Sequence, residues 1–290
     1  MRDFRKVGIV GCGLMGAGIA EVCARADLDV LVAERGAEAL ATGRARLIAS
    51  LDRGLRSGKL TERERETALR RLSFTPDLAD FSDRDLVIEA VAERLNAKTS
   101  VFEQLDRILA DDDAIIASNT SSIPIIDLAV STRRPQHVVG VHFFNPVPRQ
   151  RLVEVIPTEL TSPLVTDQVT SFAERVLGKT VVRARDRAGF VVNALLIPYL
   201  VSAVRMLESG VASAEDIDNG MELGCAHPMG PLRLLDLIGL DTAQSVAESM
   251  YAEFKEPLYA PPPLLRRMVA AGALGRKSGR GFYLYATERG

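Results

Sequence analysis

A histidine and a glutamate twelve positions apart are the residues of this chain best suited to acid–base chemistry. His142 is one of only three histidines among 290 residues and ends an apolar run, and Glu154 lies within the next apolar run, Leu152–Ile156. An imidazole titrates near physiological pH, so a carboxylate on the next strand would make His142 a general base with an orienting partner. The plainer interpretation is a strand-end histidine bonded to backbone.

Composition predicts an intracellular globular enzyme rather than a nucleic-acid or membrane binder. Of the 290 residues 47% are apolar, and Lys+Arg 36 against Asp+Glu 38 leaves a net charge of -2, so no overall field attracts polyanions. Cys12, Cys23 and Cys225 show no metal-ligand spacing and are too sparse for a disulfide framework. We expect no metal and no disulfide. Because the N-terminus lacks the features of a signal peptide, we expect a cytoplasmic protein.

A glycine-rich loop between a strand and a helix predicts a dinucleotide site. The strand Lys6–Val10 runs into Gly11-Cys12-Gly13-Leu14-Met15-Gly16, helical spacing continues to residue 26, and a second strand over 28–33 ends at Glu34. The three glycines permit the tight turn, the approach of a pyrophosphate and close helix packing, and the helix N-terminus favours negative charge. A glycine loop that merely closes a turn is the alternative.

The residue pair at the end of the second strand bears on the choice between NAD and NADP. Glu34 stands eighteen residues after Gly16, where a carboxylate binds a ribose 2′-hydroxyl and repels a 2′-phosphate. Arg35 follows at once, and a guanidinium there could pair with that phosphate. We favour NAD, with NADP as the open alternative.

Further strands at regular intervals predict a doubly wound Rossmann-type sheet. Apolar runs over 85–90, 114–118 and 138–142 alternate with a helix over about 96–110, and Glu93, residues 118–122 and His142 follow strand ends that share one sheet edge. An insertion over 38–82 has the pattern of a helical pair. Its flank of Arg46, Ser50, Arg53 and Ser57 is either a solvated face or a contact for a phosphate-bearing substrate.

The composition changes near residue 186, which predicts two domains, residues 1–186 and a smaller all-α domain over 187–290. No alternating strand occurs in the second until residues 282–285. The apolar run over 190–207 contains Asn193, Pro198 and Arg205, so it predicts a buried helix rather than a membrane span. Because so apolar a helix must be covered, we expect a homodimer through this domain. Asn193 either caps a loop or faces the interdomain cleft and binds substrate.

Taken together, these segments resemble the 3-hydroxyacyl-CoA dehydrogenase family, in particular its single-function bacterial 3-hydroxybutyryl-CoA dehydrogenase type. The resemblance runs from Gly8 to Tyr285. Five runs carry it: residues 118–122 (SNTSS), 142–146 (HFFNP), 189–193 (GFVVN), 227–231 (HPMGP) and 275–283 (GRKSGRGFY).

The resemblance implies a role for each candidate residue in a reaction between a (3S)-3-hydroxyacyl-CoA and a 3-oxoacyl-CoA. His142 would take the hydroxyl proton, Glu154 would orient its ring, and Ser121 and Asn193 would hydrogen-bond the substrate oxygens. The dinucleotide would be contacted by Glu93, Lys98, Ser121, Asn145 and Lys277. Ser50 and Arg53, with the basic flank of their helix, would meet the phosphates of coenzyme A. The cofactor carries the hydride, so no metal is needed.

Departures from the family pattern leave the substrate tail open. Arg149-Gln150-Arg151 stands where relatives commonly have Val-Met-Lys, Ala194 where they have Arg, and Ser57 where some have a lysine. Arg149 and Arg151 would bind a distal carboxylate, as in 3-hydroxyadipyl-CoA, or they face solvent or clamp coenzyme A. Two rival functions are a dehydrogenase of a free hydroxy acid and a non-catalytic dinucleotide-binding protein.

Three further residues have plain alternative interpretations. We expect His137 on the surface and His227 in a turn ahead of Pro228, and Lys277 is otherwise an exposed charge of the C-terminal segment.

Overall fold

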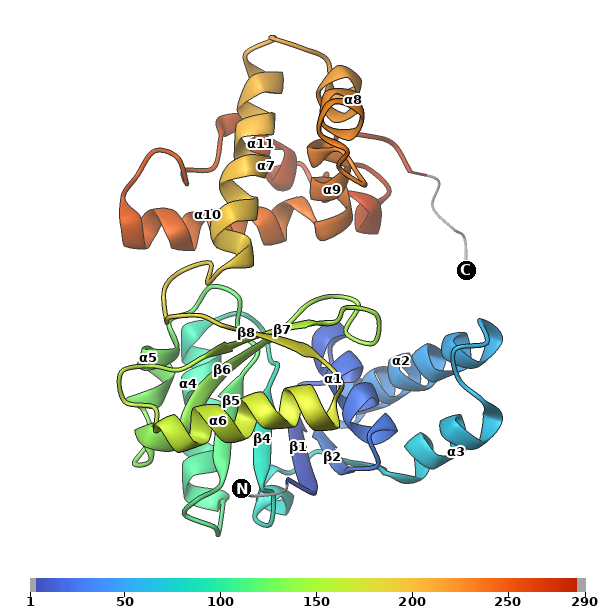
Figure 1. Cartoon of the computed structure of the whole chain (residues 1–290), viewed down its shortest axis with the longest axis vertical. Helices are drawn as coiled ribbons and strands as arrows, with labels where there is room; N and C mark the ends of the chain where they lie inside the picture. Colours follow the sequence, from blue (N-terminus) through green and yellow to red (C-terminus); the bar gives the residue numbers. More distant parts are fainter. Residues whose placement is uncertain (1–3, 286–290) are drawn as a thin grey trace. The chain divides into compact units, whose positions relative to one another are not determined.

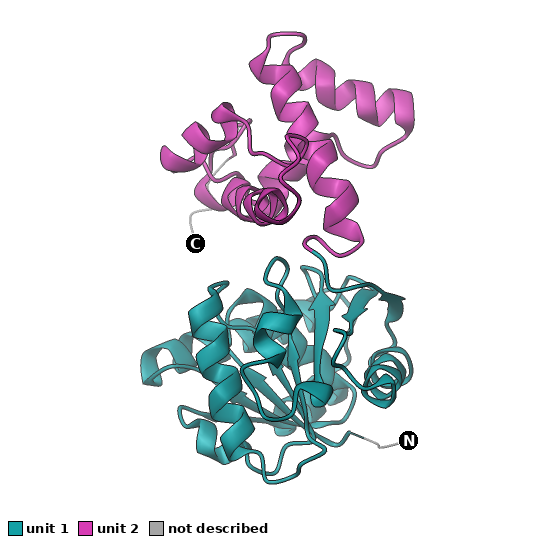
Figure 2. Cartoon of the chain, turned by 90° about the vertical axis from the view of Figure 1, so that its left-hand side faces the viewer, with its two compact units in different colours: residues 1–187 teal, residues 188–290 magenta. Residues whose placement is uncertain are grey.

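The computed structural model describes residues 4–285, which divide into two compact units with the boundary between Arg187 and Ala188 (Figure 2). The first unit is built on one eight-stranded sheet with the order β3-β2-β1-β4-β5-β6-β7-β8. The strands are β1 (Lys6–Val10), β2 (Asp29–Ala33), β3 (Leu72–Thr75), β4 (Leu86–Glu89), β5 (Ile115–Ser118), β6 (Val138–Phe143), β7 (Leu152–Ile156) and β8 (Thr180–Arg183). The first six follow the strand order of dinucleotide-binding sheets, so the predicted doubly wound fold is confirmed.

The central strands are covered on both faces, which explains their unbroken apolar sequences. Every residue of β4, β5 and β6 is buried, as expected of parallel strands between two helical layers. Figure 1 shows α1 and α6 on one face and α4 and α5 on the other. The helices of this unit are α1 (Leu14–Arg25), α2 (Ala37–Arg56), α3 (Glu62–Arg70), α4 (Leu95–Ile108), α5 (Ile125–Ala129) and α6 (Pro163–Ser171).

The strand β7 reverses the direction of the sheet. It pairs antiparallel with β6 and parallel with β8, whereas the strands from β3 to β6 are mutually parallel. The short turn between β6 and β7 therefore leaves residues of both strands opposite each other at the edge where β4 and β5 also end.

The insertion after β2 is helical only in its first part. The helices α2 and α3 form the expected pair, and Thr61 begins α3 with a capping box to Glu64. The expectation of helix through residue 82 is wrong, because the chain continues into β3, which pairs with β2 at the sheet edge, and then a 3₁₀ turn, Leu78–Phe81. The four-residue β3 is too short to show a strand period by itself.

The second unit is helical, with α7 (Val192–Glu208), α8 (Ala214–Cys225), α9 (Pro231–Ile238), α10 (Leu240–Phe254) and α11 (Pro263–Ala270). Its core gathers Leu200 and Val204 of α7 with Leu235 of α9 and Met250 of α10. The alternating residues 282–285 form no strand; in this segment only Leu284 makes an isolated bridge, to Arg280. Among the described residues no helix has both the length and the apolarity to cross a membrane.

Candidate active site

The glycine loop leaves the N-terminus of α1 open to a ligand. Gly11 has a φ of +98°, a backbone conformation that residues with a side chain rarely adopt. A Cβ on Gly16 would lie 1.8 Å from the Gly11 carbonyl oxygen. A Cβ on Gly13 would meet no atom within 4 Å. The first turn of α1 has no side-chain cap, so its N–H groups are available to an anion, and the space beside Gly13 suits a pyrophosphate.

The carboxylate at the end of β2 lies against this loop. Glu34 Oε2 accepts a hydrogen bond from the Cys12 N–H at 2.6 Å, and its Oε1 accepts one from the Arg35 N–H at 3.0 Å. Cys12, Glu34 and Arg35 line an open hollow of about 640 Å³ together with Gly13, Thr42 and Arg46. The groups around this hollow fit the adenosine end of a dinucleotide.

The predicted polar flank of α2 divides in the structure. Arg46 donates to the Cys12 carbonyl at 2.9 Å and so belongs to the glycine loop. Ser50 is half-buried and Arg53 is exposed, both further along α2. Ser57 donates to the Gly54 carbonyl at 3.1 Å.

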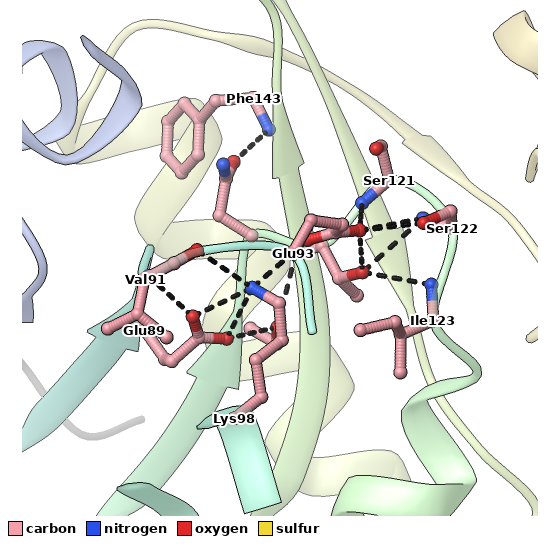
Figure 3. Close-up of polar contacts among 11 residues, drawn as sticks. Glu89, Val91, Glu93, Lys98, Ser121, Ser122, Ile123 and Phe143 are labelled. Atoms are coloured by element: carbon pink, nitrogen blue, oxygen red, sulfur yellow. Dashed lines mark hydrogen bonds and ion pairs between the residues drawn. The ribbon is translucent and has the colours of Figure 1, made fainter. Parts of the chain in front are cut away.

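Glu93, which follows β4, holds the turn that follows β5 (Figure 3). Its Oε1 accepts hydrogen bonds from the Ser121 N–H at 3.0 Å, the Ser122 N–H at 3.1 Å and the Ser122 hydroxyl at 2.9 Å, and the Thr120 hydroxyl also donates to it. The Ser121 hydroxyl makes no hydrogen bond to another described residue, and its side chain is partly exposed. Glu93 therefore fixes the backbone of Ser121 and leaves its hydroxyl for a ligand.

A buried lysine connects Glu93 to a second carboxylate that the sequence analysis missed. Lys98, 1% exposed, lies 2.7 Å and 3.0 Å from the two oxygens of Glu89 and 3.2 Å from Glu93 Oε2. Glu89, 0% exposed, also accepts from the Ser118 hydroxyl at 2.6 Å and the Val91 N–H at 2.6 Å. The signal in the sequence was a glutamate inside an apolar strand, which needs a partner once buried.

These contacts set the charge of Glu93. Burial alone would raise the pKa of Glu93, but Lys98 and the hydrogen bonds from the 120–122 turn outweigh it and hold that pKa below its ordinary value. Lys98 was expected to contact the dinucleotide, and in the structure its ammonium is directed at the two carboxylates. Lys98 therefore stabilises the Glu93 carboxylate through this ion pair.

The register of β6 and β7 places His142 directly opposite Glu154. His142 Nδ1 lies 2.7 Å from Glu154 Oε2, with His142 6% and Glu154 0% exposed. The ring also packs on Phe144, with centroids 4.5 Å apart. Asn119 at the end of β5 accepts from the Phe143 N–H at 2.8 Å, which ties the two strand ends together (Figure 3). A carboxylate so placed fixes the orientation of the ring.

The remaining predicted residues lie in other parts of the chain. Asn145 is exposed on the loop after β6. Asn193 is half-buried in the first turn of α7, after a loop in which Gly189 has a φ of +83° and Phe190 one of +46°. Lys277 forms an ion pair with Asp241 at 2.6 Å. Asn193 and Lys277 both belong to the second unit.

A buried aspartate, also missed from the sequence, anchors the segment that carries Lys277. Asp236 of α9 is 1% exposed and accepts from the Phe282 N–H at 2.9 Å, the Tyr283 N–H at 3.0 Å and the Tyr285 hydroxyl at 2.9 Å. The segment is thereby held to the helical core. Outside the predicted roles, His137 lies 3.8 Å from Asp113 and His227 bonds the Tyr199 hydroxyl at 3.1 Å.

The sheet order, the open glycine loop and the acid at the end of β2 define a dehydrogenase-type dinucleotide-binding protein. Comparison with known families and proteins makes this specific. Residues 6–187 match the NAD binding domain of 3-hydroxyacyl-CoA dehydrogenase, and residues 189–285 match the C-terminal domain of the same family. The chain therefore belongs to the 3-hydroxyacyl-CoA dehydrogenase family and is an oxidoreductase that uses a nicotinamide dinucleotide.

Individual relatives cover nearly the whole chain. A 3-hydroxybutyryl-CoA dehydrogenase of Mycobacterium tuberculosis is 57% identical over 281 residues, covering 97% of this chain and 98% of its own. The mitochondrial hydroxyacyl-coenzyme A dehydrogenase of Mus musculus is 42% identical, covering 97% of this chain and 91% of its own. The crystal structure of (S)-3-hydroxybutyryl-CoA dehydrogenase from Ralstonia eutropha superposes with a TM-score of 0.92 at 45% identity, covering 98% of this chain and 100% of that one.

Proposed function

We propose that this protein interconverts (3S)-3-hydroxybutyryl-CoA and acetoacetyl-CoA, with His142 as the general base and NAD as the cofactor. The observation that carries the proposal is the buried 2.7 Å contact between His142 Nδ1 and Glu154 at the carboxyl edge of the sheet. The choice of substrate is supported by the relatives from Mycobacterium tuberculosis and Ralstonia eutropha, which are named 3-hydroxybutyryl-CoA dehydrogenases.

The residues perform the proton half of this reaction. With Nδ1 bound to Glu154, Nε2 is the ring nitrogen that takes the proton of the 3-hydroxyl during oxidation and returns it during reduction. The buried Glu154 stabilises the imidazolium that forms. The nicotinamide ring, when bound, supplies the hydride acceptor or donor. The Ser121 hydroxyl, on the turn held by Glu93, hydrogen-bonds a substrate oxygen and limits the orientations of C3.

The test of the base is NADH oxidation with acetoacetyl-CoA in His142→Ala. We expect kcat to fall by about 10² to 10⁴, the usual contribution of a positioned general base. His137→Ala is the matched control, since His137 lies five residues earlier with only a 3.8 Å approach to the exposed Asp113, and it should keep wild-type turnover. Wild-type kcat in His142→Ala would refute the assignment.

The preference for NAD over NADP rests on Glu34. Its two oxygens already accept backbone N–H groups at the rim of the hollow beside the glycine loop, so the carboxylate is fixed where a 2′-phosphate would be repelled. We expect a higher kcat/KM with NADH than with NADPH, and a smaller ratio in Glu34→Gln. A wild-type preference for NADPH would contradict this proposal.

Two alternative substrates find no supporting contact among residues 4–285. Arg149 and Arg151, the candidate ligands for a distal carboxylate, line a hollow that includes neither Ser121 nor His142. Among the described residues, no contact at the site favours a free hydroxy acid over an acyl-CoA as the substrate. Equal turnover of acetoacetyl-CoA and 3-oxoadipyl-CoA would reopen the first alternative.

We also propose a cytoplasmic homodimer. Leu195 on α7 is 75% exposed and Leu223 on α8 is 86% exposed, although α7 buries its other face in its own unit. A second copy that covers these side chains would bury apolar area. The free thiols of Cys12, Cys23 and Cys225 fit a reducing compartment. Light scattering at varied concentration tests the dimer, which Leu195→Glu should weaken, and a monomeric wild type would contradict it.

A further inference from the structure

A second hollow in the first unit has no part in the site described above. Its volume is about 590 Å³, and α1, α3, the segment 148–151 and the segment 176–179 line it. Its lining includes five cationic side chains, those of Arg25, Arg63, Arg149, Arg151 and Lys179. We call this cavity the basic hollow.

The basic hollow is remote from the glycine loop along α1. That helix begins at Leu14, next to the loop, and ends at Arg25, which lines the hollow. Its 12 residues span about 18 Å at a rise of about 1.5 Å each. None of the predicted catalytic or cofactor-binding residues is among the lining residues.

The positive charge of the hollow is largely uncompensated. The lining also contains two acidic residues, Asp27 and Glu64, so five cations and two anions give it a formal charge of +3. The whole chain has a net charge of -2. Asp27 is already bound to Arg71 at 2.7 Å, and Glu64 caps α3 through the Thr61 N–H at 2.8 Å. Both acids are therefore engaged elsewhere.

Three of the cations have no partner among the described residues. The side chains of Arg63, Arg149 and Arg151 form no ion pair or hydrogen bond there, and all three are exposed. Arg25 reaches Glu21 only at 3.4 Å. Cationic groups that gather without counter-charges repel one another, and an anion bound between them would remove that repulsion.

The loop that carries two of the arginines is held in place. Lys179 donates to the carbonyl oxygens of Val147 and Gln150, each at 2.7 Å, and so fixes the turn between β6 and β7. Burial, with Arg25 nearby, lowers the pKa of Lys179. Arg149 and Arg151 thus project from a preorganised loop, which reduces the ordering cost of binding.

We propose that the basic hollow binds a small molecule that carries two or more phosphate groups. Guanidinium groups recognise phosphate oxygens in pairs, and the volume lies in the range of small-ligand sites. Val22, Leu60 and Leu177 provide an apolar wall for the rest of the ligand. Two sources share this chemistry: a free nucleotide or diphosphate, and the phosphorylated end of coenzyme A.

The test is isothermal titration calorimetry of the whole protein with inorganic diphosphate, ADP and coenzyme A as separate probes, with saturating NADH present so that the dinucleotide site beside the glycine loop is filled. We expect diphosphate and ADP to bind, each single variant, Arg149→Ala or Arg151→Ala, to bind about tenfold more weakly, and high salt to weaken binding. The charge-retaining Arg149→Lys should lose less. Arg107→Ala, which removes an exposed arginine of α4 without a described partner, is the matched control and should bind as wild type.

The outcomes separate the proposal from its alternatives. Absence of diphosphate and ADP binding at millimolar concentration, or equal binding by wild type and Arg149→Ala/Arg151→Ala, overturns it. If the double variant raises KM for acetoacetyl-CoA and leaves that for acetoacetyl-pantetheine unchanged, coenzyme A is the source. If neither KM changes while diphosphate binding is lost, the source is a separate phosphate compound. The calorimetric part measures binding and not turnover, so it does not depend on the proposed substrate, whereas the comparison of KM values rests on it.

Discussion

The buried lysine between Glu89 and Glu93 makes a large and specific prediction about stability. In Lys98→Met the side chain keeps an unbranched apolar stem but loses the terminal ammonium, which leaves the fully buried Glu89 carboxylate without a cation. Removing one partner of a buried ion pair costs about 3–5 kcal/mol, because the remaining charge stays desolvated. That is a large share of the usual stability of about 5–15 kcal/mol.

An exposed ion pair in the same unit provides the control. Lys6 lies 2.6 Å from Asp83, as close as Lys98 lies to Glu89, but the two side chains are 46% and 49% exposed. Lys6→Met should therefore cost about 0–1 kcal/mol. The contrast between the two variants isolates burial from distance.

The measurement is urea unfolding followed by circular dichroism, together with the KM for NADH. We expect a much lower unfolding midpoint for Lys98→Met than for Lys6→Met, and recovery in Glu89→Gln/Lys98→Met, where the buried charge is gone as well. A raised KM for NADH should accompany the single variant, because Glu93 also loses a partner. Equal midpoints for Lys98→Met and Lys6→Met would refute the reasoning.

Three further predictions follow from single contacts. Gly16→Ala should unfold the glycine loop, because its Cβ would lie 1.8 Å from a carbonyl oxygen, whereas Gly13→Ala, with no atom within 4 Å, should keep the wild-type melting temperature and lose NADH affinity; equal melting temperatures of the two variants would contradict this. The lowered pKa of Glu93 gives a stability contribution that is present above its ordinary value of 4.5 and lost as the pH falls through the folded value. Acid unfolding curves should therefore be flatter in Glu93→Gln than in wild type, and parallel curves would show that Glu93 does not contribute. In Asp236→Asn the amides of Phe282 and Tyr283 lose a charged acceptor, so their hydrogen exchange should be at least about tenfold faster, and unchanged protection would disprove the anchoring role.

The glycine loop was predictable because its chemistry is local. Gly11, Gly13 and Gly16 act through backbone freedom and close approach, which depend on residues a few positions apart, and Glu34 follows one helix and one strand later. The edge strands β3 and β8 were not predicted. Each has four residues with mixed exposure, and a strand of this length is stable only through pairing with a neighbour that the local sequence does not reveal.

The sequence predicted which two residues, His142 and Glu154, form the candidate general base and its partner. Their geometry was decided by the tertiary structure. The sequence indicated a histidine and a carboxylate on successive strands. Only the antiparallel register of β6 and β7 places them opposite each other, since a slip of one residue would put the two side chains on opposite faces.

What the sequence by itself determined is the family, the fold class and the types of residue available for chemistry, because motifs and periodicity are properties of short segments. Tertiary structure decided which charges meet. It placed Lys98 between two carboxylates instead of at the surface, and it grouped Arg149 and Arg151 with Arg25 and Arg63 in a hollow away from the glycine loop. The physical reason is that charge pairing and burial depend on distances in space between segments that lie far apart along the chain.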